Sequence, residues 1–406
     1  MPHSTIQSIA VGLQPKLVEI RRDLHQHPEL SNREFRTAGI VAEHLKGLGL
    51  SVQTGVAHTG VVGLLEGDRP GPTIAVRADM DALPIQELNV VPYRSEHDGV
   101  KHACGHDVHT TVGLGVAEVL SQIRTMLAGS VKFIFQPAEE GAPAGETGGA
   151  YLMLDEGVLD NPSVESILGL HVMPTLDAGK LGYHAGPVWA SNDAIELVIH
   201  GRKTHGAYPH TGIDAILVVS HVLQALQTLV NRSVDVRDPL LISFGMIQGG
   251  NQFNVIADEV RLLGMMRCLS PELRRTAPGR IEELVRGITN SFGASHSLKF
   301  TPGAPVTMNH PKMVEKAVPV LEAAVGKANV LLQKPQMGAE DFACYAERVP
   351  GFYFMLGVRN ESRGITEMLH TPHFDVDEAC LSVGVQAMSS LVLEYLSSHQ
   401  QDAAGS

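Results

Sequence analysis

The sequence predicts an α/β fold in which a large domain, with a mostly parallel sheet and helices on both faces, is interrupted by a small α+β domain of ferredoxin-like type. Two observations lead to this prediction. Short apolar strands alternate with helices over residues 1–187 and again over 302–406. Between them, residues 188–301 follow the order β-α-β-β-α-β of a split βαβ unit. We therefore expect a discontinuous large domain and one inserted domain.

The first part of the large domain opens with two helices. Apolar residues from Ile6 to Leu24 recur at spacings of three and four, which is one helical stripe, and Pro28 ends it. A second helix is expected over 33–48, before Gly49. The alternating elements that follow are strands at 61–65 and 73–77, a helix at 108–127, a strand at 131–135, a helix near 149–156 and a strand at 166–171.

The inserted domain and the last part of the chain have patterns of their own. In the inserted domain we expect strands at 194–200, 240–247, 260–268 and 297–301, with helices at 213–231 and 271–291. In the last part we expect helices at 311–325, 339–347 and 378–397, and a strand at 352–358. This last part returns to the alternation of the first part, so both are expected to share one domain.

The composition excludes several classes of protein. Of the 406 residues, 44% are apolar and 18% charged, which is typical of a folded globular protein. The net charge is −13, from 31 Lys and Arg against 44 Asp and Glu, which argues against nucleic acid and an anionic membrane surface as partners. Four cysteines without CxxC spacing form neither a zinc finger nor a disulfide scaffold. Because the N-terminus has no signal-peptide pattern, we expect a cytoplasmic protein.

Residues with reactive or metal-binding side chains concentrate in the stretch HACGHDVH at 102–109. It contains Cys104, His106 and His109 and is expected at a junction between a loop and a helix. A thiolate with two or three imidazoles within eight residues suits a transition metal of the zinc or manganese class. The alternative is a buried cysteine beside surface histidines, with Asp107 as a helix cap.

A second polar group follows the expected strand at 131–135. Glu139 and Glu140 lie just beyond the end of this strand, where a parallel sheet forms its ligand crevice. Adjacent carboxylates point in different directions, so one suits a metal ligand and its neighbour a general base, the two roles that metal hydrolases require. A solvated acidic loop is the alternative.

Further candidates stand at other strand ends and late in the chain. Asp79 and Asp81 follow one expected strand, and His171 ends another, where a hydrogen-bonded core histidine is the alternative to a ligand. His370 and His373 occur together near the C-terminus. Each signal is weak alone. Jointly they predict one metal site, because strand ends in a parallel sheet meet at one crevice.

Six motifs together resemble a known family. The motifs are RADMDALP (77–84), HACGHD (102–107), FQPAEEG (135–141), LHV (170–172), GAEDF (338–342) and HTPHFD (370–375). In this order they resemble peptidase family M20, the metallopeptidases that include aminoacylases and glutamate carboxypeptidases. The likeness is greatest to its amidohydrolase branch, which holds hippurate hydrolases, N-acyl-L-amino acid amidohydrolases and hydrolases of indole-acetyl-amino-acid conjugates. It implies a catalytic α/β domain at 1–187 and 302–406, with a lid or dimerisation domain at 188–301.

The resemblance implies a site for two divalent metal ions in each subunit. The ligand positions correspond to Cys104, His106, Glu140, His171 and His370. Cys104 would bridge the two ions. Other branches carry a His ligand where this chain has Arg77, a departure that fits the amidohydrolase branch. Asp79 then orients a ligand without binding metal, and Asp81 is expected to be structural. The mixed S, N and O ligands favour Mn²⁺ or Zn²⁺, and Co²⁺ or Ni²⁺ are compatible.

The same resemblance implies the roles of the remaining residues. Glu139 matches the general base, which takes a proton from water between the metals, so that metal-bound hydroxide attacks an amide carbonyl, and then protonates the leaving amine. In the inserted domain, His205 corresponds to a histidine that reaches a neighbouring subunit's site and polarises the carbonyl. Asn254 corresponds to a substrate contact. Arg267 corresponds to a clamp for the substrate carboxylate, with a solvated strand residue as the alternative.

We therefore predict an amidohydrolase that cleaves hippurate-, N-acetyl- or indoleacetyl-type N-acyl amino acids to an acid and a free amino acid. A homodimer, or a dimer of dimers, is expected from the lid domain. The alternatives are a dipeptidase or carboxypeptidase of the same family and a non-catalytic metal- or ligand-binding protein on this fold. The intact Glu139 argues against the last, because a binding protein needs no general base. Glu340 and Asp341 are expected to open a helix, and a place for Glu340 in the site is the alternative.

Overall fold

The computed structural model describes residues 2–404, and the chain forms two compact units, each with its own apolar core. Unit 1 comprises residues 1–186, 308–334 and 344–406, and unit 2 comprises residues 187–307 and 335–343. The predicted inserted domain at 188–301 falls within unit 2. Unit 2 also contains 335–343, which the sequence analysis assigned to the large domain.

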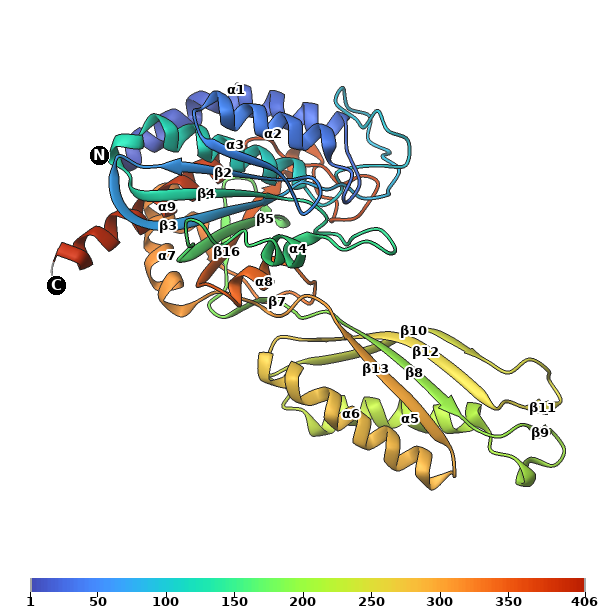
Figure 1. The fold of residues 1–406 in the computed structure, drawn as a ribbon. Helices are drawn as coiled ribbons and strands as arrows, with labels where there is room; N and C mark the ends of the chain where they lie inside the picture. The colour runs from blue at the N-terminus through green and yellow to red at the C-terminus, as the bar shows by residue number, and fades with distance from the viewer. Residues whose placement is uncertain (1, 405–406) are drawn as a thin grey trace. The chain divides into compact units, whose positions relative to one another are not determined.

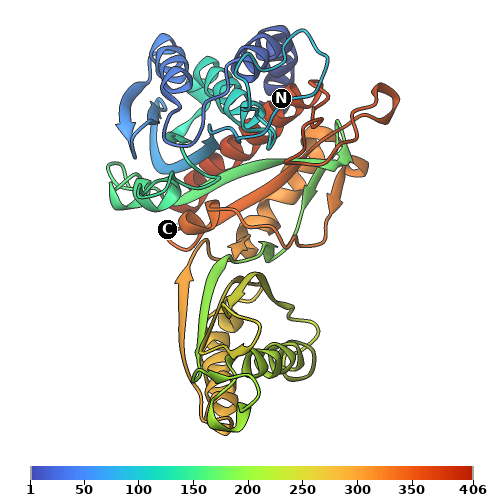
Figure 2. The same ribbon diagram turned by 90° about the vertical axis from the view of Figure 1, so that its right-hand side faces the viewer.

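Unit 1 is built on an eight-stranded sheet of order β1-β2-β4-β3-β5-β16-β6-β15. Its strands are β1 (Ser51–Val56), β2 (Gly60–Glu66), β3 (Arg69–Asp79), β4 (Ala128–Gln136), β5 (Ser166–Asp177), β6 (Leu181–Tyr183), β15 (Val330–Leu332) and β16 (Gly351–Arg359). The four central strands, β4, β3, β5 and β16, run parallel to their neighbours within that group. Figure 2 shows β5, in green, beside β16, in orange, although the two are far apart in the sequence. The predicted fold class, a mixed α/β fold with a mostly parallel central sheet, is confirmed.

Helices cover this sheet and complete the core of unit 1 (Figure 1). They are α1 (Pro2–Gln26), α2 (Phe35–Gly47), α3 (His106–Gln122), α4 (Gly149–Asp155), α7 (Pro311–Val325), α8 (Phe342–Ala346) and α9 (Cys380–Ala404), of which α8 begins in unit 2. The central strands are continuous apolar runs because both of their faces are buried, as in Phe352 and Phe354 of β16. Among the described residues, Cys380–Ser398 of α9 is apolar and long enough to cross a membrane, and 78% of it is buried in the fold.

Unit 2 has a four-stranded antiparallel sheet of order β10-β12-β8-β13 and two helices. The elements are β8 (Asp193–His200), α5 (Ala215–Thr228), β10 (Leu240–Gly249), β12 (Glu259–Cys268), α6 (Pro271–Ser291) and β13 (Ser295–Pro302), with a small ladder of β9 (Thr204–His205) and β11 (Val255–Ile256). Their order along the chain is the predicted β-α-β-β-α-β. Buried and less buried side chains alternate along β8, because only one face of this sheet packs against the helices.

Several elements of unit 1 differ from the sequence prediction, among them the short strands β6 and β15, which were not predicted, and β5, which continues past residue 171. Strand β1 was not predicted, because its residues SVQTGV are mostly exposed and lack an apolar run. Helix α3 begins at His106, two residues earlier than expected, and ends at Gln122 rather than 127. The earlier start matters, because it places His106 in the first turn of the helix.

Candidate metal and catalytic site

The predicted site residues of unit 1 lie near the carboxyl ends of its parallel strands. Asp79 is the last residue of β3, and Glu139 follows the end of β4 by three residues. The prediction that His171 ends its strand was wrong, because β5 continues to Asp177. His171 does lie beyond Leu168, where the pairing of β5 with β3 stops. The crevice expected at this edge of the sheet therefore has these polar side chains around it.

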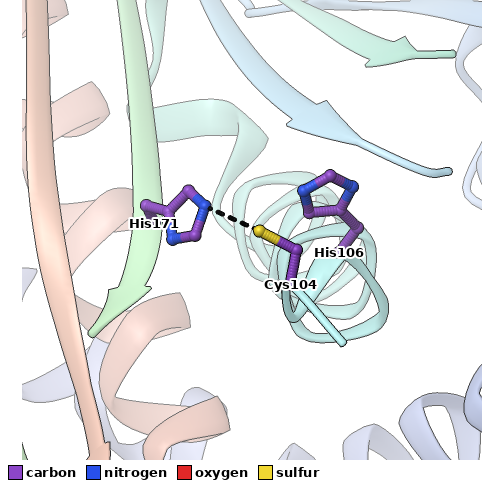
Figure 3. A group of neighbouring side chains, drawn as sticks. All are labelled: Cys104, His106 and His171. Carbon is purple, nitrogen blue, oxygen red and sulfur yellow. Dashed lines mark hydrogen bonds between the residues drawn. The ribbon is translucent and has the colours of Figure 1, made fainter. Parts of the chain in front are cut away.

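Five side chains form two groups of possible metal ligands that share Cys104. We name the group Cys104, His106 and His171 the buried triad, and the group Cys104, Glu140 and His370 the outer triad. Within each triad the ligand atoms all lie within 4.8 Å of one another. Figure 3 shows the buried triad, in which Cys104 Sγ lies 3.4 Å from His171 Nε2. In the outer triad, His370 Nε2 lies 3.2 Å from Cys104 Sγ and 3.1 Å from Glu140 Oε1.

The start of α3 brings Cys104 and His106 together. Gly105, between them, has a φ of +85°, a backbone conformation that side chains with a Cβ rarely adopt. A Cβ at this position would also lie 2.4 Å from Cγ2 of Val172 on β5. Only glycine therefore allows this turn to pack against β5 beside His171.

The imidazole of His106 is held by Asp81. His106 Nδ1 donates to the main-chain oxygen of Asp81 at 2.8 Å and lies 3.1 Å from its Oδ1, so Nδ1 carries the proton. The other oxygen of Asp81 accepts from the backbone N–H of Glu140 at 3.0 Å. His106 Nε2 is buried and makes no hydrogen bond to any described residue. Asp81, expected to be merely structural, thus orients one candidate ligand from each triad.

Asp79 is held by two residues that lie outside both triads. Arg77 Nη1 donates to Oδ2 of Asp79 at 2.5 Å. The backbone N–H of Val172 donates to His109 Nε2 at 2.9 Å, so the other ring nitrogen, Nδ1, donates to Asp79 Oδ1 at 2.6 Å. Because both of its nitrogens are used, His109 is not available as a metal ligand, although it belongs to the cluster 102–109. Asp79 Oδ2 lies 3.9 Å from His106 Nε2, which is beyond hydrogen-bonding distance.

The carboxylates of the cluster favour positive charge at its centre. Burial, reinforced by Glu140 and Glu139, raises the pKa of the Cys104 thiol well above its usual value. Burial opposes a charge on His106, but the carboxylates around it outweigh burial and raise its pKa to about 10. Burial lowers the pKa of His171 well below its ordinary value, so this imidazole is neutral. A thiolate at Cys104 therefore needs a neighbouring cation.

The general-base candidate, Glu139, lies on a turn that a hydrogen bond to Glu34 stabilises. Glu139 Oε2 is 4.0 Å from His106 Nε2, at the same distance as Glu140 Oε1. Ala138, just before them, has a φ of +53°, and its N–H donates to the buried Glu34 at 2.9 Å. Burial, reinforced by Asp81, raises the pKa of Glu34 to about 7.

The three candidates of unit 2 divide into a pair and a separate residue. The β9–β11 ladder pairs His205 with Val255, and the N–H of Gly206 donates to the main-chain oxygen of Asn254 at 2.8 Å. His205 and Asn254 are thus neighbours, and both are exposed. His205 Nδ1 accepts from the N–H of Ala207 at 3.0 Å, which leaves Nε2 as the nitrogen that carries a proton.

Arg267 lies apart from this pair, on β12. Its Nη1 donates to the main-chain oxygen of Met337 at 2.9 Å. Partial burial lowers the pKa of Arg267, and within the described part of the chain no carboxylate is near enough to affect it. The guanidinium keeps donors for an added acidic group.

The remaining candidates are placed as follows. Glu340 Oε1 accepts from the N–H of Phe342 at 3.0 Å, at the start of α8, in agreement with the helix-opening role. His373 is exposed and belongs to neither triad. The other cysteines, Cys268, Cys344 and Cys380, are buried and form no disulfide within the described residues.

Sequence reasoning missed two supporting residues, Glu34 and Lys101, and the orienting role of His109. His109 carried a usable signal, because it stands three residues after His106 on the same helix face. Glu34 and Lys101 had none, because their contacts are with residues distant in the sequence.

A metal-accepting cluster at the strand ends of such a sheet, with an adjacent carboxylate, defines a metallohydrolase class of site. Residues 75–394 match the sequence profile described as Peptidase family M20/M25/M40. The chain belongs to this family, and the protein is a hydrolase.

Individual relatives extend over nearly the whole chain. A protein of Synechocystis sp. named a probable hydrolase is 43% identical over 96% of this chain and 98% of its own. Thermostable carboxypeptidase 2 of Saccharolobus solfataricus is 36% identical, over 93% of this chain and 95% of its own. An N-acetylcysteine deacetylase of Bacillus subtilis is 37% identical, over 93% and 96%.

A solved structure has the same fold throughout. It is a Bacillus subtilis protein described as a dinuclear metal-binding peptidase of the M20 family. It is 35% identical to this chain, with a TM-score of 0.84, and the match covers 95% of this chain and 99% of the other.

Proposed function

We propose that the protein is a dinuclear metal amidohydrolase that cleaves N-acyl amino acids to a carboxylic acid and a free amino acid. The observation that carries the proposal is the pair of triads that share Cys104, with Glu139 beside them. The five ligands are Cys104, His106, Glu140, His171 and His370. The N-acetylcysteine deacetylase among the relatives supports the substrate class.

The residues present fit two divalent cations. Each triad offers three ligand atoms, and Cys104 belongs to both, so its thiolate would help to hold both ions. His106 Nε2 is buried without a hydrogen-bond partner among the described residues, and the acidic surroundings already favour a positive charge on this ring. Mixed S, N and O donors suit Mn²⁺ or Zn²⁺ best, and Co²⁺ or Ni²⁺ are compatible. When bound, such ions lower the pKa of water and stabilise charge that develops on an amide oxygen.

Glu139 is the proposed general base. Its carboxylate accepts a proton from the attacking water and delivers it to the amide nitrogen as the C–N bond breaks, so that water and amide become acid and amine. Asp81 keeps His106 Nε2 and Glu140 in place during this step. Asp79, held by Arg77 and His109, takes no ligand position in this proposal.

Unit 2 is proposed to recognise the substrate. Arg267 binds the substrate carboxylate, because it has donors left and none of the described carboxylates is near enough to affect it. His205 donates from Nε2 to the acyl carbonyl of the neighbouring subunit's substrate, and Asn254 contacts the same substrate. These roles require a homodimer. The edge strand β10 supports one, because among the described residues it has no partner strand on one side, and it exposes Leu241, Met246 and Ile247.

A carboxypeptidase or dipeptidase is the second candidate function. It is favoured by the similarity to thermostable carboxypeptidase 2, and it uses the same metals, base and carboxylate clamp. For either function we propose a cytoplasmic location, which the four buried cysteines without a disulfide support.

The test is amine release from hippurate, N-acetyl and indoleacetyl amino acids and from dipeptides, with the metal-free protein reloaded with Mn²⁺ or Zn²⁺. The wild type is expected to hydrolyse N-acyl amino acids. Glu139→Gln is expected to bind both metals and lose about 10²- to 10⁴-fold in kcat. Glu146→Gln, on the same loop, is the matched control and should keep kcat. Activity on dipeptides alone would move the protein to the peptidase function, and an active Glu139→Gln would overturn the mechanism.

A further inference from the structure

Lys101 is a buried cation that the proposed mechanism does not use. Its side chain has no exposed surface, and burying an ammonium group is costly unless its donors are satisfied. The backbone N–H and C=O of Lys101 both bond to the backbone of Leu83 in a short antiparallel bridge. Leu83 lies four residues after the end of β3, so this bridge fixes Lys101 near the end of that strand. The contacts of this buried ammonium group, three residues before Cys104, therefore indicate what Lys101 does.

The ammonium group of Lys101 holds the segment that carries His370. Lys101 Nζ donates to the main-chain oxygens of Pro372 at 2.9 Å and Phe374 at 2.7 Å. It also lies 3.5 Å from the carboxylate of Glu87. Two of its three donors thus go to residues 372–374, which begin two positions after the outer-triad histidine, His370.

The His370 segment needs such support. His370 has a φ of +61°, which costs energy in a residue with a side chain, and the side chain is half exposed. The other bonds to the oxygens of Pro372 and Phe374 come from the N–H of Leu88 (3.1 Å) and from Asn89 Nδ2 (3.0 Å). Without Lys101, one bond remains on each of these two oxygens. The N–H of His370 donates to the main-chain oxygen of Ala103 at 2.8 Å, so the backbone of His370 is held on one side and the residues after it by Lys101.

We propose that Lys101 is a positioning residue that presents His370 to the metal of the outer triad. The inference rests on the proposed function. It predicts that Lys101 matters for one of the two metals, because no bond of its ammonium group reaches His106 or His171.

Lys132 provides a matched control within the same unit. It too is a buried lysine on a core element, and its Nζ donates to three main-chain oxygens, of Val158, Asp160 and Pro162. None of these belongs to a segment that bears a candidate ligand. Replacing Lys132 thus reports the general cost of losing a buried ammonium group.

The test titrates Co²⁺ or Zn²⁺ into the metal-free wild type, Lys101→Met and Lys132→Met, and compares both binding steps with the folded fraction. Methionine fills a similar volume, and Glu87 keeps bonds from His25 and Ser95. In Lys101→Met we expect one metal to bind as in the wild type and the other about 10- to 100-fold more weakly. Lys101→Arg should restore part of this loss, and Lys132→Met should bind both metals normally.

The possible results are distinct. Unchanged binding of both metals in Lys101→Met, or equal weakening of both metals in the two methionine variants, would overturn the inference. If Lys101→Met does not fold, Lys101→Gln decides, because its shorter side chain keeps a polar end but cannot reach both carbonyl oxygens; weaker binding of a single metal supports the inference and normal binding of both metals refutes it. A wild type that binds fewer than two metals would instead overturn the proposed function itself.

Discussion

The buried and outer triads contain the same number of ligand atoms but are built in different ways. The buried triad takes His106 from the first turn of α3 and His171 from within β5, and all of its members are buried. The outer triad takes Glu140 and His370 from loops, and the His370 side chain is half exposed. Regular elements in a packed core hold their side chains through many neighbours. Loop residues depend on a few hydrogen bonds: here Asp81 and Glu34 accept from the backbone of the loop that carries Glu140, and Lys101 donates to the His370 segment.

The difference suggests that one half of the site belongs to the fold and the other half is added to it. Loops on a rigid scaffold tolerate change better than core elements do. On this view the ligands of the buried triad are positioned by the fold itself, so the site forms whenever the chain folds. The outer triad sets how tightly its second position is held.

The largest effect is expected where the two triads meet. Cys104 belongs to both, so Cys104→Ser should weaken both metals, each by more than about 100-fold, which exceeds the usual cost of losing an outer partner. Hydrolysis should fall below detection. Metal content of the purified, dialysed protein measures this, with Cys344→Ser, another buried cysteine, as the control. Retention of one tightly bound metal would show that the thiolate is not shared.

A pH effect is expected from Glu34, which accepts a hydrogen bond from the turn before Glu139 and Glu140. The folded pKa of Glu34, about 7, is above its unfolded value of 4.5, so the folded state holds the extra proton between these values. The resulting stability is fully present below pH 4.5 and is lost as pH rises through 7. Relative to Glu34→Gln, which does not titrate there, the metal-free wild type should lose up to about 3 kcal/mol of unfolding free energy from pH 4.5 to 8.

Urea unfolding at several pH values measures this difference. Glu43→Gln, on the exposed side of α2, is the control and should follow the wild type. Parallel pH curves for Glu34→Gln and the wild type would contradict the raised pKa.

A smaller effect separates the two triads by stability without metal. His106→Ala removes buried hydrogen bonds to Asp81 and should cost about 1–3 kcal/mol of unfolding free energy. His370→Ala should stay within about 0.5 kcal/mol of the wild type, because its side chain is half exposed. Unfolding of the chelator-treated proteins measures both. Equal costs would remove the distinction between a core half and an added half.

Much of the fold could be predicted because the patterns are local. Continuous apolar runs marked the central strands, and the order of elements in 188–301 marked the split βαβ unit. Strand β1 was missed because its side chains are mostly exposed, and the place of 335–343 in unit 2 was missed because no local pattern encodes it.

The candidate site could be predicted in its residue types but not in its connections. The cluster at 102–109 and the pair Glu139 and Glu140 were singled out from their spacing and from their places after strands, and the family resemblance assigned their roles as ligands and base. Sequence spacing does not tell which oxygen of Asp81 meets which neighbour. Nor does it show that both ring nitrogens of His109 form hydrogen bonds, one with Asp79 and one with the backbone of Val172.

The sequence by itself determined the fold class, the family resemblance and the residues proposed as ligands and base, because apolar periodicity and motif order are properties of the chain. Only the tertiary structure decided that Cys104 is common to two triads and that Lys101 supports the His370 segment. The physical reason is that these contacts join distant residues, 67 apart for Cys104 and His171 and more than 260 apart for the contacts to His370 and its segment, and their distances follow from how the strands and helices pack.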